Sequence, residues 1–115
     1  MRRAVILAAL ILVAAPALAE TRCGWIDNPT PGNWFLTDRD GAWALGLQGV
    51  DLGNNWLDVD VPEFAEWASD GGRAGFGCGC FEGTVDRRSG DASWISSVRA
   101  LPLSRCHDDP ALPAR

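Results

Sequence analysis

The sequence predicts a small β-rich α+β domain, in which two antiparallel hairpins form a small sheet, one short helix lies near residues 61–69, and two disulfides fix the ends. Three observations carry this prediction. Apolar segments occur in pairs separated by turn residues, which is typical of hairpins. One segment begins with helix-capping residues. Four cysteines stand in a short chain, and an even number of them in an exported protein indicates disulfides.

The first 19 residues have the pattern of a cleavable signal peptide. Two arginines precede the apolar run Ala4–Ala15, and a proline and the small-residue segment Ala17–Ala19 follow. The apolar run is shorter than the roughly 20 residues that a membrane-spanning helix needs. We expect cleavage after Ala19, which leaves residues 20–115 as one small domain in the periplasm or outside the cell. We expect no membrane anchor after cleavage.

The charge of the predicted mature domain excludes one class of partner. The chain has 10 basic residues, of which Arg2 and Arg3 lie in the leader, and 15 acidic residues, so residues 20–115 carry a formal charge of −7. Such a surface repels phosphate backbones and anionic headgroups. We therefore expect no nucleic-acid partner.

The first predicted hairpin follows an irregular segment. Residues 20–32 contain two prolines and an Asn-Pro step, which suggests an extended or turning segment. Residues 33–37 and 42–47 read as strands, and Asp38–Gly41 reads as the turn between them, since an Asp-Gly step tolerates positive φ. A Gly- and Asn-rich loop is expected over residues 48–60.

The predicted helix covers residues 61–69. Asp60 and Glu63 have the spacing of a capping box. Phe64 and Trp67 follow three residues apart and would share one helix face. This is the one helix that the sequence predicts after the leader.

A glycine-rich strand over residues 74–81 begins the second hairpin. In an extended chain Cys78 and Cys80 face one side, while Gly75, Gly77 and Gly79 leave the other side bare. A bare face indicates that another backbone or an aromatic ring packs closely there.

The rest of the chain completes this hairpin and ends in a tail. Residues 84–86 and 94–101 read as its paired strands, joined by a loop at 87–91. The tail from Pro102 onward, which contains Cys106 and further prolines, is expected to be irregular.

The same strand geometry limits the pairing of the four cysteines. Cys78 and Cys80 would have Cα atoms about 6.6 Å apart, whereas a disulfide needs Cβ atoms about 3.8 Å apart. We therefore expect Cys23 and Cys106 each to pair with one of them, in an order that stays open. Zinc or copper(I) bound by these cysteines and His107 is the alternative, but the Cys-x-Cys spacing differs from that of structural zinc sites. We expect no metal and no other cofactor.

Binding is the function class that the sequence favours, since no catalytic constellation stands out. Trp25 and Trp34 flank a Pro- and Gly-rich loop, and large aromatic side chains anchor interfaces. With the turn residues Asp38 and Asp40, they are the candidate binding residues. We expect a non-catalytic binding module whose partner is an exported protein or a cell-wall component. A proteinaceous inhibitor of a cell-wall hydrolase is the alternative, and a metal-binding or enzymatic protein is a third.

Three segments carry a resemblance to a known family. They are RCGWIDNPTPGNWFLTDRDGAW at the start of the predicted domain, GFGCGC in its centre, and LPLSRC followed by Asp109-Pro110 near the end. Together they resemble a bacterial family of small exported proteins, domain of unknown function number four thousand and eighty-seven. The family commonly has an aromatic residue at the position of Ala74, and this chain departs from it there. The resemblance implies export and a single domain, and it carries over no catalytic residue.

Overall fold

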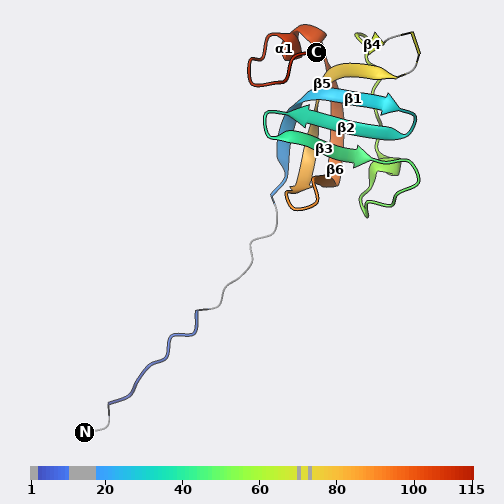
Figure 1. Cartoon of the computed structure of the whole chain (residues 1–115). Coiled ribbons are helices and arrows are strands. Elements are labelled where there is room, and N and C mark those ends of the chain that lie inside the picture. The colour runs from blue at the N-terminus through green and yellow to red at the C-terminus, as the bar shows by residue number, and fades with distance from the viewer. Residues whose placement is uncertain (1–2, 11–17, 70, 73) are drawn as a thin grey trace.

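The computed structural model describes residues 3–10, 18–69, 71–72 and 74–115 and is dominated by a β-sheet (Figure 1). The strands, the 3-10 helix η1 and the α-helix run in the order β1 (Glu20–Thr30), β2 (Asn33–Asp38), β3 (Gly41–Gly46), η1 (Trp56–Asp58), β4 (Ala68–Ser69), β5 (Gly75–Asp86), β6 (Asp91–Leu101) and α1 (Leu103–His107).

Five of the strands close into a barrel. The sheet order is β1-β2-β3-β6-β5-β4, and β1 also pairs with β5, so the ring is complete and β4 is added at its side. The β3–β6 pairing, at Ala44 and Asp91, is parallel, and the other pairings are antiparallel. A five-stranded barrel of this Greek-key kind is the architecture that includes the OB-fold.

The prediction of a sheet made of two hairpins was wrong, because the sheet has six strands of mixed direction. Both hairpins are present as β2–β3 and β5–β6. The segment that looked irregular is β1, which pairs with both of them. Its prolines are compatible with a strand because Pro29 lies where the β1–β2 register shifts, and Pro31 lies beyond the end of β1.

Asparagine side chains bridge β3 and β6 beyond their pairing. The Asn54 side-chain amide donates to the carbonyl oxygens of Leu45 and Ala92, at 3.0 and 2.8 Å. The Asn55 amide donates to the Ile95 carbonyl at 2.7 Å, and its side-chain oxygen accepts from the Ile95 N–H at 2.9 Å. These side chains take the place of a neighbouring strand at this seam of the barrel.

The helix predicted at residues 61–69 is absent; the α-helix of the structure is α1, in the tail that was expected to be irregular. Phe64 and Trp67 instead pack on the glycine-rich strand. A Cβ on Gly77 would lie 2.8 Å from the Phe64 ring and 3.0 Å from the Trp67 ring. Packing over the bare glycine face outweighs the local capping signal. The expectation that another backbone or an aromatic ring packs closely on this face is confirmed, since the Phe64 and Trp67 rings lie over Gly77 and the Ala68 carbonyl lies over Gly75.

The core fills the barrel interior. Its buried members are Ile26, Leu36, Trp43, Leu45, Phe81, Ala92, Ile95 and Val98. A second, smaller apolar cluster lies outside the barrel and joins Trp25 of β1 to Cys78 and Cys106, with Leu112 packed against it. This second cluster attaches α1 and the segment that follows it to the outer side of β1 and β5.

Two disulfides link the chain, as the cysteine count predicted. Cys23 and Cys80 are direct cross-strand neighbours on β1 and β5 and form one bond. Cys78 on β5 and Cys106 on α1 form the other. Of the two pairings that the sequence left open, the structure therefore contains Cys23–Cys80 and Cys78–Cys106.

The predicted leader lies partly outside the described residues, which omit 1–2 and 11–17. Residues 3–10 and 18–19 contain no helix or strand and extend away from the barrel (Figure 1). No helix within the described ranges is both long and apolar enough to cross a membrane.

Candidate functional site

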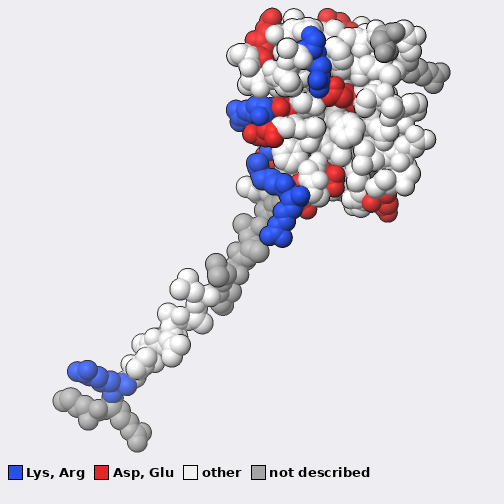
Figure 2. Space-filling view, in the orientation of Figure 1, with Lys and Arg blue, Asp and Glu red and all other residues white. Residues whose placement is uncertain are grey.

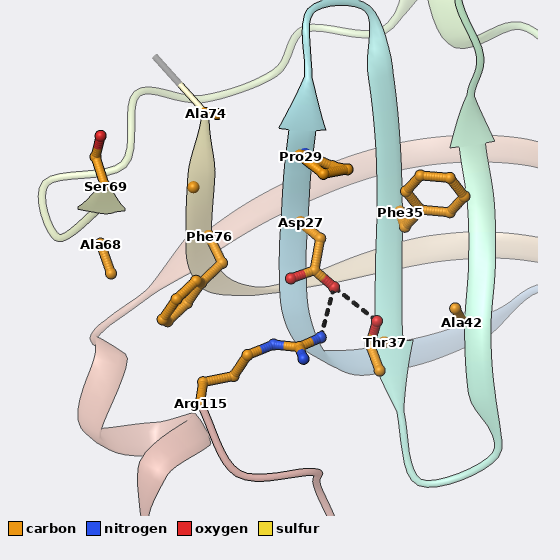
Figure 3. Close-up of a pocket in the computed structure, with 11 residues that line it drawn as sticks. Asp27, Pro29, Phe35, Thr37, Ala42, Ala68, Ser69, Ala74, Phe76 and Arg115 are labelled. Atoms are coloured by element: carbon orange, nitrogen blue, oxygen red, sulfur yellow. Dashed lines mark hydrogen bonds and ion pairs between the residues drawn. The ribbon is translucent and has the colours of Figure 1, made fainter. Parts of the chain in front are cut away.

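A wide groove of about 770 Å³ crosses the outer surface of the barrel over β3, β2, β1, β5 and β4. We call it the outer groove (Figure 3). The face of the molecule over β1–β3 carries few charged atoms (Figure 2). The apolar residues that line the groove are Pro29, Phe35, Ala42, Ala68, Ala74 and Phe76.

Strand register builds the centre of the outer groove. Asp27 on β1 pairs with Phe35 on β2 and with Phe76 on β5. The three side chains therefore form one row across the sheet, with the carboxylate between two aromatic residues (Figure 3). Alternation along β1 turns the neighbouring residue Ile26 into the barrel core, where it is fully buried.

The Asp27 carboxylate is held by two partners. The Thr37 hydroxyl donates to its Oδ2 at 2.7 Å, and Nη2 of Arg115 donates to the same oxygen at 2.9 Å. The side chains of Asp27 and Arg115 are 17% and 29% exposed, so the ion pair is open to solvent on one side. Among the described residues that line the groove, these two are the charged ones.

The tail beyond α1 brings Arg115 to this position. The indole N–H of Trp25 donates to the Pro113 carbonyl at 2.8 Å. The Trp25 ring also meets His107 of α1 and Phe76 of β5 edge to face, with centroids 5.0 and 5.2 Å apart. Trp25 therefore fastens the tail along β1, and this places Arg115 at the outer groove.

Comparison with models of protein families identifies the family of this chain. A family model described as a protein of unknown function matches residues 17–113. The chain belongs to the DUF4087 family. The resemblance seen in the sequence is thereby confirmed. No curated protein and no solved structure gives a significant match.

Of the four residues singled out in the sequence of this DUF4087 domain, two are buried. Trp25 is 1% exposed and Asp38 is 7% exposed. Trp34 is partly buried, and its ring lies 5.9 Å from that of Trp56 and 6.1 Å from that of Trp67. Asp40 has 42% of its side chain exposed. The structure therefore shields Trp25 and Asp38 from solvent, because Trp25 packs against the tail outside the barrel and Asp38 binds Arg22 at the end of the barrel.

Asp38 and Asp40 come together on one arginine at the end of the barrel. Nη1 of Arg22 donates to Asp38 at 2.8 Å and to Asp40 at 3.0 Å. The Arg22 guanidinium also lies 4.5 Å from the ring centroid of Trp43, whose indole N–H donates to Asp38. A cation held by carboxylates and an aromatic face closes this end of the core.

The electrostatics of this cluster indicate a structural role. Burial acts to lower the pKa of Arg22, but its hydrogen bonds to Asp38, Asp40 and Glu20 outweigh burial and raise this pKa above the ordinary value. The hydrogen bond from Arg22 is also the main cause that lowers the pKa of Asp40. Arg22 and Asp40 therefore keep their charges at neutral pH, which makes these two groups unsuited to proton transfer there.

Among the described residues of the DUF4087 chain, the outer groove is a better candidate for a functional site than any cluster of reactive side chains. Within them, no group of three or more His, Cys, Asp and Glu side chains is placed to hold a metal ion. The groove residues Asp27, Phe35 and Phe76 were missed in the sequence because the prolines obscured β1. The alternation of Trp25 and Asp27 with the buried Ile26 would have revealed the outward face of a strand.

Proposed function

We propose that this DUF4087 domain is an exported, non-catalytic binding module whose outer groove takes up an apolar polypeptide segment. The observation that carries the proposal is the groove itself, a cavity of about 770 Å³ over the strands with Phe35 and Phe76 in its lining. A contiguous, open apolar surface on a small domain is typical of an interaction site.

The lining favours a polypeptide over other ligand classes. Hydrogen-bonding side chains are few there, namely Asp27, Thr37, Ser69 and Arg115, and a polysaccharide would leave many hydroxyls unpaired on such a surface. The formal charge of −7 on residues 20–115 disfavours nucleic acid.

Two features support the exported location. Disulfides persist in oxidising compartments outside the cytoplasm, and the chain contains Cys23–Cys80 and Cys78–Cys106. The pattern of residues 1–19 is that of a cleavable leader. N-terminal sequencing of the protein recovered from its bacterial host tests this part: we expect Glu20 as the first residue, and Met1 would contradict export.

Selection from a random heptapeptide phage library on the immobilised domain tests the binding role. We expect enriched apolar sequences whose synthetic peptides bind the wild type. The Ala42→Phe variant should bind these peptides more weakly, because Ala42 is exposed on β3 and lines the groove, so a ring there occupies part of it. An aromatic residue is well tolerated at an outward strand position.

Ser93→Phe is the matched control, since Ser93 is exposed on β6, away from the groove lining. This variant should bind the peptides as the wild type does. The proposal fails if no sequence is enriched over a blank surface, or if Ala42→Phe binds the selected peptides as tightly as Ser93→Phe does.

A further inference from the structure

The contact between Arg115 and Asp27 shows which side chain the outer groove accepts. A guanidinium nitrogen lies 2.9 Å from the Asp27 carboxylate, which stands in a row between Phe35 and Phe76. We infer that the outer groove selects a cationic side chain, arginine or lysine, flanked by apolar residues of a partner polypeptide. When no partner is bound, Arg115 of the domain itself takes the place of that cationic side chain next to Asp27. The inference rests on the proposed function.

Asp27 is suited to anchor such a cation. Its side chain is 17% exposed, which reduces screening by solvent but leaves access from the groove. The Thr37 hydroxyl donates to Oδ2 at 2.7 Å and holds the carboxylate in place, so little ordering is needed when a cation arrives. The aromatic residue on each side offers an apolar surface to the stem that carries the cation.

Charge favours a cationic partner at long range. Residues 20–115 carry a formal charge of −7, and such a field raises the rate at which a basic segment meets the domain. The described charges of the groove lining are those of Asp27 and Arg115 alone. Once Arg115 moves away, the groove presents a single carboxylate to its occupant.

Arg115 is held weakly enough to be displaced. Its side chain is 29% exposed, and an ion pair of this openness contributes little. The contact that fastens its segment, from the Trp25 indole to the Pro113 carbonyl, lies two residues away and does not involve the Arg115 side chain. A partner that supplies a cation and apolar contacts together therefore replaces it.

Titration of isotope-labelled protein with three capped tripeptides, followed by NMR, tests the inference. The probes are acetyl-Val-Arg-Val-amide, the same peptide with citrulline, which is the neutral isostere of arginine, and acetyl-Val-Leu-Val-amide. We expect the arginine peptide to bind about two- to fivefold more tightly than the citrulline peptide. The Arg115→Gln variant should bind the arginine peptide about two- to fivefold more tightly than the wild type does, because the competing cation is gone.

Asp27→Asn should bind the arginine and citrulline peptides equally, since its amide oxygen still accepts from Thr37 but carries no charge. Asp58→Asn is the matched control: it makes the same change in net charge at an exposed aspartate outside the groove lining, and should retain the preference for arginine.

The outcomes separate this inference from the proposed function. Equal binding of the arginine and citrulline peptides to the wild type would overturn the inference while the apolar peptide still bound the groove. Unchanged affinity in Arg115→Gln would overturn the role of Arg115 as occupant. If none of the peptides shifts the groove resonances in any variant, both the inference and the proposed function fail.

Discussion

The Asn55→Ala substitution should destabilise the barrel strongly, because Asn55 replaces a missing strand at the seam between β3 and β6. Its side chain satisfies both backbone groups of Ile95, at 2.7 and 2.9 Å. The N–H and C=O of a strand residue point to the same side, so both Ile95 groups face this seam. Ile95 is 1% exposed, which limits replacement of the lost partners by water.

The expected magnitude follows from these two bonds. An unmade hydrogen bond to a buried backbone group costs about 1–3 kcal/mol, so the pair should cost about 2–6 kcal/mol. For a domain of this size, at about 4–8 °C per kcal/mol, that loss lowers the melting temperature by roughly 8–48 °C. Urea unfolding followed by tryptophan fluorescence measures the loss as a lower midpoint with an unchanged slope.

Asn33→Ala is the matched control. Asn33 also makes two side-chain hydrogen bonds, to Thr30 and to the N–H of Gln48, but both are exposed to solvent. Its loss should cost less than about 1 kcal/mol. If Asn55→Ala unfolds at the same urea concentration as Asn33→Ala, the two hydrogen bonds between Asn55 and Ile95 do not stabilise the barrel.

Four further predictions concern the crosslink, the charged cluster and the glycine face. Replacing Cys78 and Cys106 by serine should cost about 3–4 kcal/mol in urea unfolding, from the 28-residue separation that the bond closes. Arg22→Met should cost about 3–5 kcal/mol, since it leaves a buried carboxylate without its cation. The pKa of Asp40 is lower in the folded domain than in the unfolded chain, where an aspartate has a pKa of about 3.9. The ionised Asp40 therefore stabilises the fold above that pH, and this stabilisation is lost as the pH falls through the lower pKa of the folded domain. The difference in urea midpoint between wild type and Asp40→Asn should therefore shrink in that range, and a constant difference would contradict the ion pair. Gly77→Ala should cost about 1–3 kcal/mol, because its Cβ meets an aromatic ring.

The sequence determined those features that depend on neighbouring residues. Turn chemistry located both hairpins, β2–β3 and β5–β6, because an Asp-Gly step and a Gly-containing loop fix a reversal locally. Alternation along the strand at residues 74–81 put its glycines on one face and its cysteines on the other. The cysteine count gave two disulfides in a chain with the pattern of an exported protein.

Only the tertiary structure decided how these pieces meet. The capping residues near Asp60 predicted a helix, but the glycine face of β5 offered Phe64 and Trp67 a larger gain through packing. The prolines of β1 made its sequence look irregular, although β1 is a strand that pairs with β2 on one side and with β5 on the other.

The outer groove is likewise a product of strand register. Asp27, Phe35 and Phe76 lie on three strands that are distant in sequence, and they become neighbours only when β1 pairs with both β2 and β5. Trp25 and Asp38 looked like binding residues because large aromatic and charged side chains serve interfaces and interiors alike. Their burial depends on contacts with Pro113 and Arg22, which local sequence does not encode. Residue type thus drew attention to large aromatic and charged side chains, and the long-range pairing of β1 decided which of them are buried and which line the outer groove.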